Sequence, residues 1–218
     1  VLIVTGSLQC PFYVLKAMKR IFDRKEDKIR VIQTVTGGGF GGKLDGGTGG
    51  NMRGIAIVDL LITSYGVIAG NVLRRCGSGY CAINISSGAW DVDNNTMYDI
   101  DSTAAMFFMN YSNGQTARLR NNILYATSAT TYHGYGNGAT SAMLTASNNL
   151  YFGNGTGPSQ AGKVDANPLF TNASTGDFTL QSSSPAKNAG TTVATATDRN
   201  GVARPQGAGF DIGAYEFV

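Results

Sequence analysis

Three copies of a paired-asparagine box recur at a fixed interval in the middle of the chain. The copies begin at Asn94, Asn121 and Asn148, so each starts 27 residues after the one before. A weaker copy, Asn71-Val72-Leu73, lies about one interval upstream. A constant interval of this length is typical of a solenoid, in which each repeat buries its apolar face only by stacking on its neighbours. The boxes therefore predict a stacked architecture.

Between the boxes, short β-prone runs alternate with Gly, Ser and Asn. Residues 97–100, 105–111 and 116–119 are the three runs of one repeat. Runs this short suit a parallel β-helix with three strands per coil and are too short for a helical repeat. We therefore predict an all-β fold, a right-handed parallel β-helix of about five coils with an irregular last coil, over residues 51–218.

Equivalent positions around the boxes carry equivalent side chains. The apolar positions that we expect to form inward stacks are Val92, Leu119 and Ala146 before the boxes, and Leu73, Met97, Leu124 and Tyr151 after them. Asparagine tolerates left-handed backbone, and its amide can bond to the repeats above and below. An asparagine ladder should therefore run along one edge.

Composition limits the functional classes. The 218 residues include 30 Gly and only 14% charged residues, which suits many short strands and turns better than helices. Residues 1–45 hold 8 Lys/Arg against 4 Asp/Glu, but in a pattern typical of one solvated helix face, so we expect no nucleic-acid partner. No apolar run reaches membrane-spanning length, and no signal peptide is visible. We expect a monomer.

The three cysteines do not form a disulfide framework. Cys76 and Cys81 flank a short turn and could close a small disulfide, while two buried thiols fit the spacing equally well. Cys10 would remain unpaired in either case.

The front of the chain differs from the repeats. Residues 1–36 read as strand, helix and strand: Val1–Thr5, an amphipathic pattern over Pro11–Phe22, and Ile29–Val35. Residues 37–50 are a glycine-rich junction. Because the open end of a β-helix exposes core and unpaired backbone, we expect the helical pattern to form a short N-terminal α/β cap.

Residues 1–43 also carry a family resemblance. The stretches 4–13 and 31–43, the second ending in Gly-Gly-Gly-Phe-Gly-Gly-Lys, resemble the molybdenum-binding subunit of the xanthine dehydrogenase and aldehyde oxidase family. The resemblance implies that Gly39, Phe40 and Gly41 would lie beside molybdopterin. Leu44 stands where the family usually has an acidic residue, and the other cofactor loops have no counterpart downstream. One loop cannot enclose a large cofactor, so we expect no molybdopterin and interpret the segment as a fused or chimeric fragment.

A second resemblance covers about residues 50–218. Three ordered motifs, at 164–170, 176–190 and 211–217, are similar to the ending of bacterial secreted right-handed β-helix proteins of the pectate-lyase-like superfamily. The resemblance implies a secreted or cell-surface protein in a carbohydrate-related setting. Four acidic residues in this region read as turn and cap residues: Asp177, Asp198, Asp211 and Glu216.

Aligning the repeats on their boxes predicts two outward columns. Asp91 and Asp93 should lie beside Arg118 and Arg120, about 4.8 Å apart along the axis. This arrangement is either a surface ion-pair ladder of small energetic value, or a site in which the arginines grip uronate carboxylates and the aspartates hold calcium. The same four residues are the weak catalytic candidates.

The second column contains aromatic rings. Arg74, Tyr98, Tyr125 and Phe152 should stack as a sugar-binding platform, because a pyranose lays its C–H face on a ring. Aromatic packing under a loop is an equally good interpretation. His133, the only histidine, reads as a solvent-facing turn residue.

These patterns leave three functional hypotheses. The favoured one is a secreted or cell-surface β-helix protein that binds a polysaccharide. The alternatives are a polysaccharide lyase or hydrolase of the pectate-lyase-like superfamily, and a structural spacer or chimeric fragment that carries a non-functional piece of a molybdenum hydroxylase. We expect no cofactor; calcium, held by Asp91 and Asp93, is the alternative.

Overall fold

The computed structural model describes residues 2–6, 29–33, 55–57, 65–75, 81–86, 88–100, 105–110, 114–127 and 131–218, with side chains from residue 65 onward. These residues are nearly all β-strand, turn and loop, with a single 3-10 turn at Ser141–Met143 among them. The helical pattern predicted over Pro11–Phe22 lies outside them.

Two strands belong to the front segment. β1 (Leu2–Gly6) and β2 (Ile29–Gln33) pair in parallel, close to the two strands that the sequence predicts there. A parallel pair requires a crossover between its strands, and the residues of that crossover are outside the described part of the chain.

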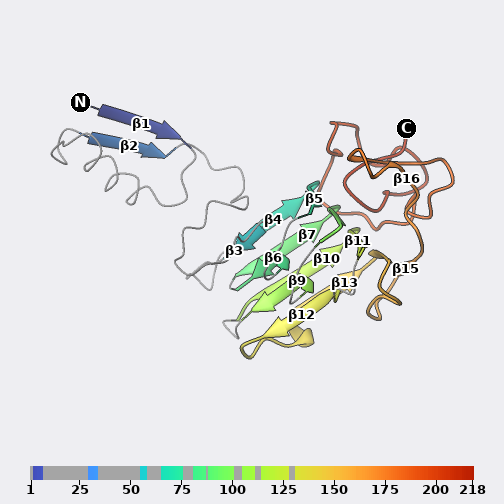
Figure 1. The fold of residues 1–218 in the computed structure, drawn as a ribbon, viewed down its shortest axis with the longest axis horizontal. Coiled ribbons are helices and arrows are strands. Elements are labelled where there is room, and N and C mark those ends of the chain that lie inside the picture. The colour runs from blue at the N-terminus through green and yellow to red at the C-terminus, as the bar shows by residue number, and fades with distance from the viewer. Residues whose placement is uncertain are drawn as a thin grey trace.

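The repeats build three parallel sheets (Figure 1). Their strands, in chain order, are β3 (Ile55–Ile57), β4 (Tyr65–Ala69), β5 (Val72–Arg74), β6 (Cys81–Ile85), β7 (Ala89–Asp93), β8 (Thr96–Tyr98), β9 (Ala105–Asn110), β10 (Thr116–Arg120), β11 (Ile123–Tyr125), β12 (His133–Gly136), β13 (Leu144–Ser147), β14 (Leu150–Phe152) and β15 (Val164–Asp165). From β3 to β14 the chain visits the sheets in strict rotation. The sheet orders are β3-β6-β9-β12, β4-β7-β10-β13 and β5-β8-β11-β14-β15.

The first asparagine of each box makes the corner between two of these sheets. Asn94, Asn121 and Asn148 have φ of 53°, 55° and 50°, in the left-handed region that asparagine tolerates better than most residues. In the weaker upstream copy, Gly70 takes this place with φ of 66°. Each box therefore marks the bend at which the chain leaves one sheet for the next.

The second asparagine of each box forms the predicted ladder. Asn71, Asn95 and Asn122 each donate an Nδ2–H bond to Oδ1 of the next member, at 2.9–3.0 Å, and Asn149 ends the series. The same amides also donate to carbonyl oxygens of the preceding repeat: Asn95 to Ile68, Asn122 to Val92 and Asn149 to Leu119. Since Asn95, Asn122 and Asn149 are fully buried, this ladder satisfies polar groups that water cannot reach.

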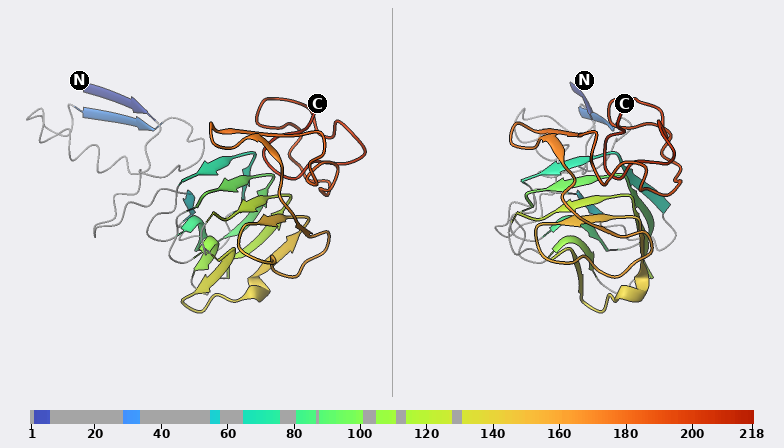
Figure 2. Two further views of the ribbon diagram at one scale, coloured as in Figure 1. Left: turned by 45° about the vertical axis from the view of Figure 1, so that its right-hand side comes forward. Right: turned by 90° about the vertical axis from the view of Figure 1, so that its right-hand side faces the viewer.

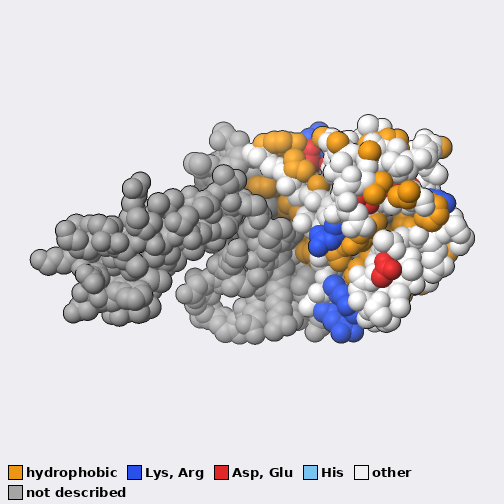
Figure 3. Space-filling model, turned by 90° about the horizontal axis from the view of Figure 1, so that it is seen from above, with side chains coloured by type: hydrophobic (Ala, Val, Ile, Leu, Met, Phe, Trp, Pro, Cys, Tyr) orange, Lys and Arg blue, Asp and Glu red, His pale blue; other side chains and the backbone are white. Residues whose placement is uncertain are grey.

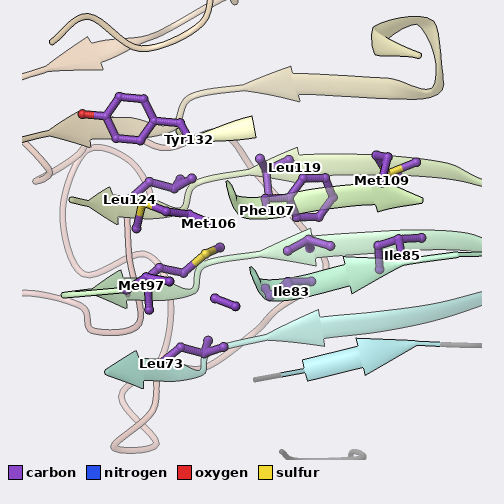
Figure 4. Close-up of a cluster of buried hydrophobic side chains, with 14 of the residues drawn as sticks. Leu73, Ile83, Ile85, Met97, Met106, Phe107, Met109, Leu119, Leu124 and Tyr132 are labelled. Atoms are coloured by element: carbon purple, nitrogen blue, oxygen red, sulfur yellow. The ribbon is translucent and has the colours of Figure 1, made fainter. Parts of the chain in front are cut away.

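A first apolar core lies between the three sheets (Figure 4). The predicted inward stacks are confirmed: Leu73, Met97, Leu124, Tyr151, Val92 and Leu119 are buried, and Ala146 packs against them half-buried. In Figure 4, Leu73, Met97 and Leu124 lie one above another alongside side chains of the other two sheets. Because the repeats stack in register, the apolar side chains of each repeat are buried against those of its neighbours.

A second apolar core lies outside the sheets. The C-terminal segment, residues 166–218, contains the antiparallel pair β16 (Phe170–Asn172) and β17 (Asp177–Leu180) and covers the outer face of β5-β8-β11-β14. Figure 2 shows this segment in orange to red against that side of the molecule. Ile123 and Leu150 on the sheet pack with Phe170 and Phe178 of the segment. The sheet thus has a buried face on both sides.

The asparagine boxes also hold the C-terminal segment. The side chains of Asn94, Asn121 and Asn148 donate to the carbonyls of Asp211, Thr191 and Ala189, at 2.9, 2.7 and 2.9 Å. One doublet therefore performs two tasks, because its first residue binds the segment and its second residue joins the repeats.

Carboxylates close the turns of this segment, as the sequence predicts. Each of the four acidic residues accepts backbone N–H bonds. Asp177 accepts from Thr179, and Asp198 accepts from Asn200 and Val202. Asp211 accepts from Asn188 and Phe217, and Glu216 accepts from Gln206 and Asp211. Glu216 also pairs with Arg204 at 2.7 Å, and both side chains are fully buried. These four acidic residues are therefore turn and cap residues.

Candidate functional site

The outward side chains of β4, β7, β10 and β13 form a surface that we call the arginine face. In register across the strands lie Val67, Asp91, Arg118 and Thr145, and beside them Ala69, Asp93, Arg120 and Ser147. The sequence alignment of the boxes predicts this register for β7, β10 and β13, and the strand pairing confirms it.

The aspartates and arginines of this face bind one another. Arg118 donates two hydrogen bonds to the carboxylate of Asp91, from Nε and from Nη2, the second at 2.8 Å. Arg120 forms the same bidentate pair with Asp93, at 2.9 Å from Nε and 2.7 Å from Nη2. Arg120 also lies 3.2 Å from Asp91, and the Tyr65 hydroxyl donates to Asp91 at 2.6 Å. The ion-pair ladder expected from the sequence is present.

The pairing of Asp91 with Arg118 shifts the pKa of both groups, whereas burial is the dominant influence on Asp93 and raises its pKa. Burial raises the pKa of Asp91, but the hydrogen bonds from Tyr65 and Arg118 outweigh it and leave that pKa below its ordinary value. The hydrogen bonds to Asp91 raise the pKa of Arg118. Both shifts favour the charged forms of this pair, a carboxylate on Asp91 and a guanidinium on Arg118.

The carboxylates of Asp91 and Asp93, which the sequence suggests as calcium ligands, are hydrogen-bonded to other side chains. Their carboxylate oxygens accept bonds from Arg118, Arg120 and Tyr65, and the side chains are 6% and 1% exposed. Within the part of the chain that the structure describes, no cluster of three His, Cys, Asp or Glu side chains is placed to hold a metal ion. Both carboxylates are therefore already paired with arginine guanidinium groups in the structure.

The outer side of the arginine face is open. Tyr65 is 62% exposed, Val67 is 51% exposed, and the side chain of Arg118 is 53% exposed although it is anchored at Asp91. An aromatic ring, an aliphatic side chain and a fixed cation thus lie together on one solvent-facing sheet surface.

Tyr65 is the residue of this site that the sequence reasoning missed. It pairs with Ala89, 24 residues later, whereas the box-based alignment rests on an interval of 27. The shorter first repeat therefore hid its register. The detectable signal was the alternation of Tyr65, Val67 and Ala69 ahead of Gly70.

The predicted aromatic column forms and lies under the C-terminal segment. Arg74, Tyr98, Tyr125 and Phe152 are in register, with centroid distances of 4.8 Å between Tyr98 and Tyr125 and 4.9 Å between Tyr125 and Phe152. Tyr98 is 5.1 Å from Phe178. Arg74 donates to the carbonyl of Ser174 at 2.8 Å. These contacts are those of aromatic packing under a loop, the second interpretation of the pattern.

The expectation for His133 is wrong. It lies on β12 rather than in a turn, is 9% exposed, and its Nε2 is 3.1 Å from the hydroxyl of Tyr151. Burial lowers the pKa of His133 to about 4, so the ring is neutral in the folded protein at neutral pH. The glycine next to His133 makes the sequence look like a turn, but its role is to leave room for a neighbouring side chain. A Cβ at Gly134 would lie 2.5 Å from the ring of Phe108.

One cavity of about 270 Å³ lies within the C-terminal segment. Lys187, Asn188, Asp211 and Phe217 are among its lining residues, and Nζ of Lys187 lies 3.6 Å from the ring centroid of Phe217. None of the site residues predicted from the sequence lines it. Seen from above, the described surface mixes apolar, uncharged polar and scattered charged side chains (Figure 3).

Two family models match separate parts of the chain. Residues 90–192 match a domain of unknown function, DUF5123, and residues 1–52 match a molybdopterin cofactor-binding domain. The second match confirms the resemblance of residues 1–43 to a fragment of the molybdenum-binding subunit. No curated protein matches the chain.

The molybdopterin interpretation falls on residues that the structure does not describe. Gly39, Phe40 and Gly41 lie there, and β1 and β2 are the only described elements within residues 1–52. Among the described residues, no helix has the length and apolarity needed to cross a bilayer.

Proposed function

We propose that residues 51–218 form a right-handed parallel β-helix with three strands per coil, which binds an acidic polysaccharide on its arginine face. The rotation of the chain through three parallel sheets supports the architecture. The C-terminal motifs favour a secreted or cell-surface protein. Residues 1–52 take no part in this proposal.

One observation carries the binding proposal: Arg118 is both anchored and half exposed. A guanidinium has five N–H donors, and the grip on Asp91 uses two of them. The remaining donors are held in a fixed orientation, so a ligand carboxylate would bind without the entropy cost of ordering a free arginine side chain. A uronate sugar supplies such a carboxylate.

The neighbouring side chains suit the rest of a sugar. Tyr65 presents an exposed ring on which the C–H face of a pyranose can lie, and its hydroxyl is held by Asp91. Thr116 and Thr145 expose hydroxyl-bearing side chains on the same face. The face is a sheet surface rather than a pocket, which suits a chain polymer more than a small ligand.

The test is affinity electrophoresis in gels containing pectate, alginate or a neutral glucan. We expect retardation by the acidic polymers that weakens with salt. Arg118→Ala should weaken binding about tenfold, which corresponds to about 1.4 kcal/mol and is within the range of a charge-assisted hydrogen bond. Arg75→Ala is the matched control, because Arg75 is 70% exposed and pairs with Asp99 outside the arginine face.

Two outcomes would contradict the proposal. One is an absence of retardation by every acidic polymer, and the other is an equal effect of Arg118→Ala and Arg75→Ala. Circular dichroism of both variants shows whether the loss of the partner of Asp91 has altered the fold. Tyr65→Phe keeps the ring and should retain binding, whereas Tyr65→Ala should weaken it.

A further inference from the structure

The apolar core reaches the surface at the end of the repeats formed by β12, β13 and the turn at residues 137–143, which we call the distal end. In the preceding repeat, Met109, Ala117 and Leu119 are at most 2% exposed. Their register partners Tyr135, Leu144 and Ala146 are only half-buried, although they pack against the same core. Three inward columns are therefore only partly covered where the stack stops, whereas the columns that end at His133 and Tyr151 are buried.

The same end leaves strand edges open. β12 and β13 are each the last strand of their sheet, so one edge of each has no strand partner in the described part of the chain. In the third sheet, β15 pairs with β14 and covers its edge. At the end of β13, Ala161 forms an isolated bridge to Ser147. Among the described residues, no further strand extends β12 or β13, and the core between these two strands is only half-buried.

This end also lacks charge. Residues 121–162 contain no Asp, Glu, Lys or Arg, although the rest of the chain holds all 31 of these side chains. Proteins usually protect open strand edges with charged side chains, most often lysine, with proline or with a covering element. The distal end has a core-lining apolar surface and open edges without the usual charges.

In place of the monomer expected from the sequence, we propose that the distal end binds the distal end of a second copy of this chain, forming an end-to-end dimer. A partner with charged groups would bury them against a surface that offers no counter-charge, at a considerable desolvation cost. An identical end is neutral, carries matching apolar side chains and offers the same open edges. A two-fold contact of like surfaces also closes on itself and produces a dimer rather than a fibre.

Analytical ultracentrifugation of the full chain tests this inference. We expect a concentration-dependent species of twice the 22.8 kDa chain mass. Ala142→Lys places a charge on an exposed position of the distal turn and should raise the dissociation constant at least about tenfold. Ala194→Lys makes the same change at an exposed position of the C-terminal segment and should leave the dimer intact.

Hydrogen exchange supplies a second measurement that does not depend on a variant. Amides of β12 and β13 should exchange more slowly at high than at low protein concentration, and amides of β4 should not change. A monomer at every concentration, a dimer that survives Ala142→Lys, or protection at other strands would each overturn the proposal. Dimerisation and polysaccharide retardation are measured separately, so failure of one leaves the other standing.

Discussion

At the residue scale, the paired asparagine has a different task at each of its two positions. The first residue adopts left-handed backbone and binds the C-terminal segment, and the second is a fully buried member of the ladder. The sequence predicts the corner and the ladder, because both follow from the chemistry of asparagine at a fixed interval. It does not predict the bond to residues 189–213, because nothing local marks the distant partner.

Loss of one ladder member should strongly destabilise the protein. Asn122→Ala removes bonds to Asn149 and to the carbonyl of Val92, and leaves the backbone N–H of Asn95 without its acceptor. We expect a loss of about 3 kcal/mol or more, since each buried unsatisfied group costs about 1–3 kcal/mol. Urea unfolding measures it, with the exposed Asn200→Ala as control. A loss equal to that of the control would contradict the ladder's energetic role.

His133 should make stability depend on pH. Its pKa is about 4 in the folded protein against 6.5 for the free side chain, so the unfolded chain binds the proton more readily. The free energy of unfolding should therefore fall as pH falls through 6.5, by about 2 kcal/mol between pH 7 and pH 5. His133→Gln should lose this component in denaturant titrations at the two pH values. An unchanged pH dependence in the variant would show that His133 does not cause it.

At the element scale, backbone hydrogen bonds between successive repeats continue from the strands into the bends that follow them. Tyr125 and Phe152 pair in register, and the carbonyl of Phe152 accepts the N–H of Ala126 in the bend that follows Tyr125. The equivalent bend after Phe152 brings Gly153 directly over Ala126. Such a close approach requires glycine at that point.

A pair of glycine substitutions tests this contact. Gly153 has φ of 98°, and a Cβ there would lie 1.8 Å from the carbonyl oxygen of Ala126, whereas Gly155 has φ of 67° and open space around it. Gly155→Ala should cost about 1 kcal/mol from backbone strain alone. Gly153→Ala should cost several-fold more, measured by thermal and urea unfolding. Equal costs would mean that the two bends do not approach each other as described.

The sequence predicts the strand columns but not the segment that covers one of the sheets. The strand positions and the columns of β7, β10 and β13 follow from period-two alternation laid on the 27-residue interval. The same reasoning places Tyr98 and Tyr125 on an outer surface, which is correct for the sheet, but it does not reveal Phe170 and Phe178 packing over them. That cover comes from a non-repeating segment, whose docking site no periodicity predicts.

At the scale of the whole molecule, two cores share one sheet. Leu124 on β11 faces the core inside the repeats, and Ile123 beside it faces the core under the C-terminal segment. The two cores should therefore unfold together. The sequence motifs at residues 164–217 indicate a terminal module, but the shared sheet is visible only in the fold.

A substitution in the outer core tests this coupling. Phe178→Ala should lower the stability by about 3–5 kcal/mol, the usual cost of truncating a buried phenylalanine. Because the cores are coupled, near-ultraviolet and far-ultraviolet circular dichroism should report one coincident transition. The exposed Thr171→Ala is the control. A separate early transition confined to the C-terminal segment would contradict the coupling.

The arginine face and the stacked architecture both depend on successive repeats lying in parallel register. Ala89 and Thr116 are register partners on β7 and β10, at a strand separation of about 4.8 Å, within reach of a disulfide. Oxidising the Ala89→Cys/Thr116→Cys variant and mapping its cross-links by mass spectrometry should show the 89–116 bond. The Ala89→Cys/Thr145→Cys variant, whose positions lie on β7 and β13 with β10 between them, should form no such bond. A cross-link between 89 and 145 that forms as readily as the one between 89 and 116 would contradict the stacking of the repeats.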